Sequence, residues 1–230
     1  MIKALVFDLD DTLMPEYEYV FSGYRVLSNF LSKNYNLDRD KIYLQLVNLF
    51  QIDSKNVFNR LFDLYGISYG NEDIKELVVR YREHFPKVKP YNDVYRNLNI
   101  YRKQGYKLAI ITDGFEQAQK NKIASLELEK YFDFILVTDE YGKDFWKPSP
   151  KPFEMVKNKL SVDFDEIMYI GDNPSKDFFI KKVYPITTVK INRDKAIHRK
   201  EPYLADIKED YTIENLDMLT SLLIDRNLGN

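Results

Sequence analysis

Short apolar runs that end abruptly at polar residues recur along the chain. Four are clear and a fifth is weaker, at residues 4–7, 108–111, 134–137, 167–170 and about 185–189. Continuous runs of this length, rich in isoleucine and valine, are typical of strands buried on both faces of a parallel sheet. Helical patterns separate them, at roughly 91–104, 115–126, 150–160 and 174–183. The alternation predicts an α/β fold with a doubly wound, Rossmann-like parallel sheet.

The stretch from about 14 to 89 interrupts this alternation, because it contains no convincing strand pattern. Apolar residues recur there at helical spacing in four successive groups, which predicts about four amphipathic helices. Breaks and N-cap residues separate the groups at 36–38, 53–54 and 70–71. We therefore expect an α/β core formed by residues 1–13 and 90–230, with a helical bundle of residues 14–89 inserted after the first strand.

Composition narrows the chemistry that such a fold could carry. The chain has 230 residues, and its 34 Lys and Arg nearly balance its 36 Asp and Glu, so nothing in the overall charge indicates nucleic-acid binding. It has no cysteine and two histidines, so any metal must be held mostly by oxygen. No apolar run approaches the length of about 20 residues that spans a bilayer. We expect a soluble, cytoplasmic protein, either a monomer or a homodimer.

Four groups of polar residues follow predicted strands, at the carboxyl ends where open α/β sheets place their sites. They are Asp8-Leu9-Asp10-Asp11-Thr12, Thr112-Asp113-Gly114, Lys147 in Lys147-Pro148-Ser149-Pro150, and Gly171-Asp172 with Asp177 five residues later. Side chains two residues apart in an extended chain point to the same side, so the carboxylates of Asp8 and Asp10 would lie together. Each group alone is better explained by a solvated loop or a helix cap. The occurrence of four in order favours a site.

In this order, the groups resemble the four motifs of the haloacid dehalogenase-like (HAD) superfamily. The matching residues are Asp8-x-Asp10-x-Thr12, Thr112, Lys147 and Gly171-Asp172-x-x-x-x-Asp177. The resemblance covers essentially the whole chain, and the helical insert looks like the type-1 cap of subfamily I. It implies a magnesium-dependent phosphatase that hydrolyses a small phosphorylated metabolite. Asp113 departs from the family pattern, in which asparagine is common.

The resemblance also implies roles for single residues. Asp8 would be the nucleophile that forms an aspartyl-phosphate, and Asp10 would be the general acid and base, kept protonated by repulsion from Asp8. The phosphoryl group would be bound by Thr112, Asp113, Gly114 and Lys147. The ligands of Mg²⁺ would be Asp8, the backbone carbonyl of Asp10, and Asp172. Asp177 would lie outside the ligand set and orient Lys147 or a bound water.

Electrostatics indicate a metal independently of the family. The site would hold several carboxylates and a substrate dianion, and each like-charge pair at 4 Å costs about 4 kcal/mol at an effective dielectric constant near 20. Lys147 alone cannot offset this repulsion. A hard divalent cation with all-oxygen ligands, such as Mg²⁺, is therefore expected.

Other functions on the same scaffold stay open. A phosphomutase would return the phosphoryl group to a sugar, and a non-catalytic phospho-ligand-binding protein would only hold it. A dehalogenase needs neither a general acid nor a metal, and a receiver domain is much shorter and lacks the insert. The substrate is open among sugar phosphates, short phospho-acids and nucleoside monophosphates.

Two further groups of residues have competing interpretations. Four residues of the insert could face the substrate, namely Tyr17, Tyr19, Tyr24 and Arg25. Alternatively, Tyr24 packs in the bundle and Arg25 is solvated. Five basic residues lie between positions 190 and 200, namely Lys190, Arg193, Lys195, Arg199 and Lys200. They are interpreted as a solvated loop face, with a rim that attracts anions as the alternative.

Overall fold

The computed structural model describes residues 1–198 and 200–228, and it divides the chain into two compact units. The core unit consists of Met1–Glu16 and Lys89–Asn230, and the helical unit of Tyr17–Val88. Both divisions fall within about three residues of the boundaries expected from the hydrophobic pattern. Among the residues described, no helix combines the length and the apolar character that crossing a membrane requires.

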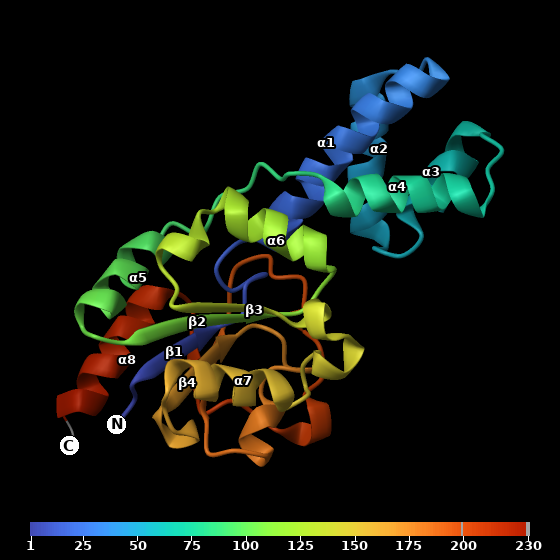
Figure 1. The fold of residues 1–230 in the computed structure, drawn as a ribbon. Coiled ribbons are helices and arrows are strands. Elements are labelled where there is room, and N and C mark those ends of the chain that lie inside the picture. Colours follow the sequence, from blue (N-terminus) through green and yellow to red (C-terminus); the bar gives the residue numbers. More distant parts are fainter. Residues whose placement is uncertain (199, 229–230) are drawn as a thin grey trace. The chain divides into compact units, whose positions relative to one another are not determined.

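The core unit is built on one parallel sheet of six strands, in the order β3-β2-β1-β4-β5-β6 (Figure 1). The strands are β1 (Ala4–Phe7), β2 (Lys107–Thr112), β3 (Phe134–Val137), β4 (Ile167–Gly171), β5 (Thr187–Ile191) and β6 (Tyr211–Ile213). Phe7 pairs with Ile110 of β2 and with Ile170 of β4. This register brings the carboxyl ends of three strands to one edge. The predicted doubly wound α/β sheet is confirmed.

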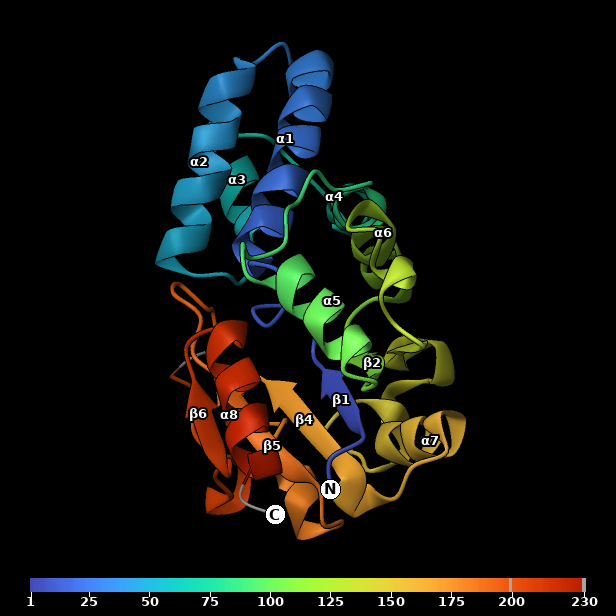
Figure 2. The ribbon, with the colours of Figure 1, turned by 90° about the vertical axis from the view of Figure 1, so that its left-hand side faces the viewer.

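Helices cover both faces of this sheet because its strands are apolar on both sides (Figure 2). They are α5 (Val94–Lys103), α6 (Glu116–Ser125), α7 (Lys151–Leu160) and α8 (Leu216–Leu228). On one face Phe153 of α7 packs edge-on against Tyr169 of β4. On the other face the rings of Phe7 and Tyr101 stack, and the Tyr101 hydroxyl donates to the carbonyl of Leu216. Alternate residues of the strands thus serve two apolar layers.

Short 3₁₀ segments connect several of these elements: Leu128–Lys130, Thr138–Tyr141, Lys143–Phe145, Phe164–Glu166, Phe179–Lys182 and Leu204–Asp206. One of them corrects the sequence prediction, because the helix expected over 174–183 is absent from this described segment and only Phe179–Lys182 is helical. The Asn173 side chain accepts from the Ser175 N–H, and its own N–H donates to the Asp177 carboxylate. These local bonds replace helical ones and turn Asp177 inward.

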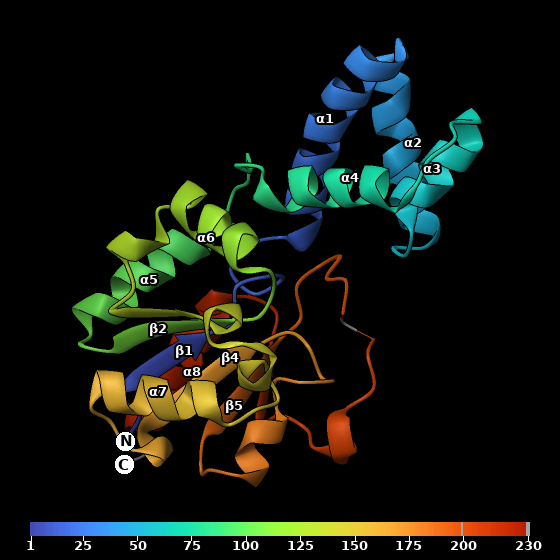
Figure 3. The same ribbon diagram turned by 45° about the vertical axis from the view of Figure 1, so that its right-hand side comes forward.

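The helical unit holds the four expected helices, α1 (Glu16–Tyr35), α2 (Arg39–Ile52), α3 (Val57–Tyr65) and α4 (Asn71–Glu83) (Figure 3). The Asp38 side chain accepts from the N–H of Lys41, which caps α2 at the predicted break. At the start of α4 the Gly70 N–H donates to the Asp73 carboxylate at 2.7 Å. The predicted helices and the breaks between them are confirmed.

Apolar and aromatic side chains fill the helical unit. Tyr24 is buried in this core, together with residues such as Leu27 and Leu61. The Tyr19 hydroxyl donates to the backbone carbonyls of Tyr81 and Arg82. For Tyr24, therefore, the structure favours packing in the bundle over the substrate-facing role. The guanidinium of Arg25 lies 4.7 Å from the centre of the Tyr43 ring, and the Tyr17 ring contacts Phe21.

The basic stretch after β5 is not simply a solvated loop. Lys190 and Arg193 are 8% and 4% exposed, which contradicts the interpretation for these two residues, while Arg199 lies outside the described residues. The Arg193 guanidinium donates to the Thr12 carbonyl at 3.0 and 3.1 Å and pairs with Asp93 at 2.8 Å. A buried guanidinium needs such acceptors, because it keeps its charge and cannot be left unpaired.

Arg193 therefore ties together the two places where the chain leaves the core unit and returns to it. Thr12 precedes the departure, and Asp93 follows the return. A backbone hydrogen bond of 3.0 Å from the Tyr91 N–H to the Leu13 carbonyl joins the same two segments. The core unit closes its own chain across the insertion point.

Candidate active site

Asp8 is the first residue beyond β1, and its backbone continues the sheet by donating to the Ile170 carbonyl at 2.8 Å. Its carboxylate accepts from the Lys147 ammonium at 2.7 Å. Lys147 also lies 2.9 Å from the Asp177 carboxylate, and its side chain is fully buried. The structure thus joins three sequence-predicted residues from separate parts of the chain in one buried ionic cluster.

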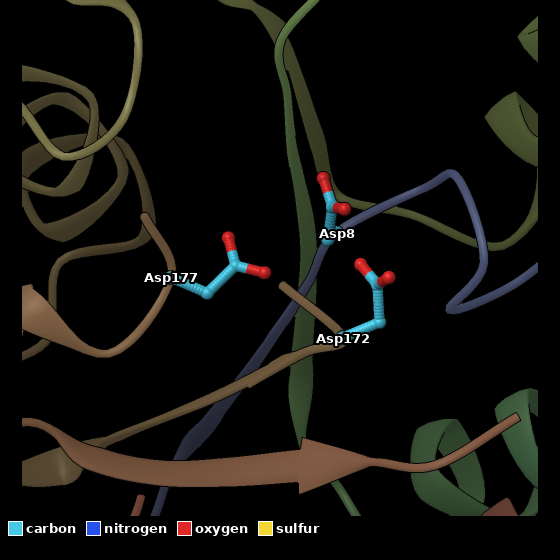
Figure 4. Close-up of side chains that lie close together, drawn as sticks. All are labelled: Asp8, Asp172 and Asp177. Carbon is cyan, nitrogen blue, oxygen red and sulfur yellow. The ribbon is translucent and has the colours of Figure 1, made fainter. Parts of the chain in front are cut away.

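Three carboxylates converge beside this lysine, those of Asp8, Asp172 and Asp177 (Figure 4). One oxygen from each lies within 4.8 Å of the others. Asp172 Oδ2 is buried and has no hydrogen-bond partner among the described residues. A buried carboxylate oxygen without a partner is costly, and a hard cation bound by oxygen would satisfy it. The donor set therefore fits a divalent ion such as Mg²⁺.

The pKa values reflect this crowding of buried carboxyl groups. Burial raises the pKa of Asp8 to about 6, although Lys147 acts in the opposite direction. Burial, reinforced by repulsion from Asp177 and Asp8, raises the pKa of Asp172 well above its ordinary value. These shifts mean that the ionised forms of Asp8 and Asp172 are destabilised unless positive charge is added. A bound cation would reverse both shifts.

Asp177 differs from its two neighbours because it is fully surrounded by donors. Its carboxylate accepts from the Tyr169 hydroxyl at 2.9 Å and from the Asn173 N–H at 2.8 Å, besides the ion pair with Lys147. Burial alone would raise the pKa of Asp177, but Lys147 and Lys176 outweigh it and lower that pKa. This geometry is the one expected of a residue that orients Lys147.

The hydrogen-bond partners of Asp10 differ from those of Asp8. Its carboxylate oxygens accept from the Lys122 ammonium at 2.7 and 2.8 Å, and one of them from the Gln119 amide at 2.9 Å. Burial favours a raised pKa, but Lys122 and Gln119 outweigh it, so the pKa of Asp10 is lowered. The expectation that Asp8 keeps Asp10 protonated is therefore wrong for this arrangement. A lysine that the motifs do not include sets the charge of Asp10.

The residues after β2 form a second wall of the site. Thr112 is buried, and its hydroxyl accepts from the Gln119 amide at 2.8 Å. One Asp113 oxygen accepts from the Thr138 hydroxyl and from the backbone N–H of Lys147, and the other pairs with Lys176 at 3.3 Å. The carboxylate that departs from the family pattern is therefore matched by a lysine, which compensates its charge.

Gly114 is constrained by both conformation and space. Its φ of +131° lies in a region that other residues rarely adopt, and a Cβ there would meet the Gln119 amide nitrogen at 2.9 Å. The glycine thus permits the turn into α6 and leaves room for Gln119.

This geometry can be compared with known proteins. A family model described as haloacid dehalogenase-like hydrolase matches residues 5–188. The chain belongs to the haloacid dehalogenase-like hydrolase family. The HAD assignment made from the four motifs is thereby confirmed.

Phosphatases are among the relatives of this HAD protein. A glyceraldehyde 3-phosphate phosphatase from Methanopyrus kandleri is 30% identical over 98% of the chain and 100% of that protein. The pyrophosphatase PpaX from Halalkalibacterium halodurans is 27% identical over 96% of the chain and 97% of that protein. The crystal structure of a HAD phosphatase from Thermococcus onnurineus is 28% identical, with a TM-score of 0.61 over 96% and 98% of the two chains. The HAD protein is thus an enzyme of phosphatase type, as the motifs predicted.

Four residues of the HAD site escaped the sequence analysis: Gln119, Lys122, Tyr169 and Lys176. Tyr169 lies within the apolar run 167–170, and nothing in the strand pattern marks its hydroxyl. A signal did exist on α6. Ala118 and Ile123 define its inward face, and Lys122 and Gln119 lie four residues from one or the other on that same face.

Proposed function

We propose that this HAD protein is a magnesium-dependent phosphatase that hydrolyses a small phosphorylated metabolite through an aspartyl-phosphate on Asp8. The observation that carries the proposal is the buried Lys147, held between Asp8 and Asp177 beside an Asp172 oxygen that lacks a partner among the described residues. The proposed nucleophile Asp8, the buried cation of Lys147 and a carboxylate oxygen of Asp172 that could bind a metal then lie close together.

Charge balance supports the metal. Among the described residues, the carboxylates of Asp8, Asp113, Asp172 and Asp177 face two ammonium groups, those of Lys147 and Lys176. Mg²⁺ bound by Asp8, Asp172 and the backbone carbonyl of Asp10 would supply positive charge that offsets the carboxylates and the substrate phosphate.

In the first step an Asp8 carboxylate oxygen attacks phosphorus, and the bond from phosphorus to the leaving oxygen breaks. Lys147 and Thr112 hold phosphoryl oxygens, and Asp10 gives its proton to the leaving oxygen. A phosphate dianion beside Asp10 favours its protonated form through like-charge repulsion, which opposes the effect of Lys122.

In the second step water attacks phosphorus of the aspartyl-phosphate, and Asp10 takes the proton of that water. The bond between phosphorus and the Asp8 oxygen breaks, which releases inorganic phosphate and restores the Asp8 carboxylate. A phosphomutase would need a sugar hydroxyl in place of this water, so the acceptor distinguishes the two outcomes.

The substrate is proposed at the level of a class. The named activities of the relatives concern a three-carbon sugar phosphate and pyrophosphate, both small phosphate compounds. The helical unit, as the cap, would exclude water and select the substrate. Sugar phosphates, short phospho-acids, nucleoside monophosphates and pyrophosphate therefore form the test panel.

The test is release of inorganic phosphate from this panel by the full chain, with Mg²⁺ or with EDTA, beside Asp8→Asn. We expect turnover that needs Mg²⁺ and falls at least about 10³-fold in Asp8→Asn. Rapid quenching with a radiolabelled substrate would trap phosphate on the protein in the wild type alone. Turnover in EDTA, or an active Asp8→Asn, would contradict the mechanism. A folded protein that binds phosphate compounds without turning any over would support the binding-protein alternative.

A further inference from the structure

Two residues of α6, Lys122 and Gln119, hold the carboxylate of Asp10, and neither belongs to the motifs described above. The Lys122 ammonium lies within 2.8 Å of both Asp10 oxygens, and its side chain is 5% exposed. Exposed ion pairs contribute little, because water screens them and their side chains move. A buried lysine with two short contacts to one carboxylate instead fixes the orientation of that carboxylate.

Gln119 connects Asp10 to the phosphate-binding side of the site. Its amide nitrogen lies 2.9 Å from Asp10 Oδ2, 2.8 Å from the Thr112 hydroxyl and 2.6 Å from the Asp113 carbonyl. Three oxygen acceptors around one nitrogen identify it as the donor end of the amide. Gly114 leaves the space that this nitrogen occupies. Gln119 therefore sets the distance between Asp10 and the residue assigned to the phosphoryl group.

The placement follows from α6 itself. Gln119 and Lys122 are three residues apart, so they share one helical face with the buried Ala118 and Ile123. That helix is anchored at its first turn, where the Glu116 N–H donates to the Asp139 carboxylate at 3.1 Å. The carboxylate of Asp10, on a loop, is thus held from a rigid element.

We propose that Lys122 and Gln119 are positioning residues for Asp10, which hold its carboxylate where it can exchange a proton with the leaving oxygen. The proposal rests on the proposed phosphatase function. Neither residue touches the substrate in this scheme. Loss of Lys122 therefore lowers kcat and leaves KM nearly unchanged, whereas loss of Gln119 also removes the bond to Thr112 and raises KM. Their effect also depends on the leaving group, because only a poor leaving group needs the proton.

The first experiment compares Lys122→Met with the wild type on an alkyl phosphate and on p-nitrophenyl phosphate, whose phenolate departs unaided. We expect kcat to fall at least about tenfold on the alkyl phosphate and less than about threefold on p-nitrophenyl phosphate. Lys122→Arg, which keeps the cation, restores part of the loss. Lys120→Met is the matched control, since Lys120 is exposed on the same helix and pairs with Glu116 and Glu140.

The second experiment is a double-mutant cycle with Asp10→Asn. If Lys122 acts through Asp10, adding Lys122→Met to Asp10→Asn lowers kcat no further. A structural role alone would lower turnover of both substrates alike and would persist in the Asp10→Asn background, which would overturn the proposal. If Lys122→Met does not fold, Gln119→Met gives the same comparison without unpairing a charge, with an expected loss of about threefold to tenfold. Absence of turnover in the wild type contradicts the phosphatase function itself, whereas active wild type with unaffected variants contradicts only the positioning role.

Discussion

A Cβ on Gly171 would lie 2.5 Å from Asp177 Oδ2, closer than any side chain can approach. Gly171 ends β4 and immediately precedes Asp172. The strand end therefore has no room for a methyl group unless Asp177 moves. Asp177 is ion-paired with Lys147, and Lys147 is ion-paired with Asp8. A methyl group added at the strand end would therefore disturb the position of the proposed nucleophile, Asp8.

Gly171→Ala tests this relationship. We expect it to displace Asp177, to lower activity at least about tenfold and to destabilise the fold by about 1–3 kcal/mol, as overpacking does. Urea unfolding and phosphate release measure the two effects. Gly70→Ala is the control, because the nearest atom to its added Cβ is 3.8 Å away, and it lies in the helical unit. An active Gly171→Ala of unchanged stability would show that Asp177 is not needed at its present position.

Tyr169→Phe removes a hydroxyl that accepts from Lys147 at 2.8 Å and donates to Asp177 at 2.9 Å. Both partners are buried charges, so we expect a loss of about 1–3 kcal/mol in the free energy of unfolding. Tyr184→Phe is the matched control, since its hydroxyl donates to Glu154 at a partly exposed position. Its expected cost is below about 1 kcal/mol. Equal costs in urea unfolding would contradict the importance of the buried hydroxyl.

The effect of Mg²⁺ is expected to depend on pH. The pKa of Asp8 is raised to about 6 and that of Asp172 well above its ordinary value, so at low pH the metal must displace protons from both. We expect Mg²⁺ to raise Tm less at pH 5 than at pH 8, with apparent affinity falling about tenfold for each displaced proton per pH unit. Asp172→Asn is expected to lose the shift at both values.

In the metal-free protein, the Asp8 carboxyl group stabilises the fold at low pH and not at high pH. Its pKa in the folded state, about 6, lies above the ordinary value of 3.8. The contribution of this group to stability is therefore present below about pH 4 and is lost as the pH rises through about 6. Equal stabilisation by Mg²⁺ at pH 5 and pH 8 would contradict the assignment of Asp8 and Asp172 as ligands.

Asp113→Asn replaces the carboxylate that pairs with Lys176 by the residue common in the family. Asparagine keeps an oxygen for the Thr138 hydroxyl and the Lys147 N–H but removes a negative charge from the site. We expect KM for a phosphorylated substrate to fall about threefold to tenfold at low salt. Adding Lys176→Met is expected to cancel the gain. An unchanged KM at low ionic strength would mean that the negative charge of Asp113 does not affect substrate binding.

Much of this fold follows from local patterns. The strands of the sheet centre are continuous apolar runs, and their ends carry three of the four motifs, so both the sheet and the positions of Asp8 and Asp172 could be predicted. Lys147 lies ten residues beyond β3, after two 3₁₀ segments. In another segment the local pattern led to a wrong prediction. The segment 174–183 has helical spacing, but the Asn173 turn and the pull of Lys147 on Asp177 override it. The strand β6 is three residues long with two of them exposed, too short to show a pattern.

Site residues could be predicted from the sequence only where they belong to one of the four motifs. The inward face of α6 indicates that Lys122 is buried, but nothing in the sequence identifies its partner Asp10, which lies 112 positions away. Lys122 and Gln119 lower the pKa of Asp10, whereas burial raises that of Asp8. Electrostatics at a buried site depend on tertiary neighbours, which spacing along the chain does not reveal.

The bonds that close the core across its insertion point have an evolutionary consequence. Arg193 and the Leu13–Tyr91 backbone bond hold the departing and returning segments of the core together. The entropy cost of closing the core around the inserted segment grows only slowly with the length of that segment, by about 0.6 kcal/mol for each doubling. A lineage could therefore exchange the inserted segment for another of different length while the core unit keeps its own closure.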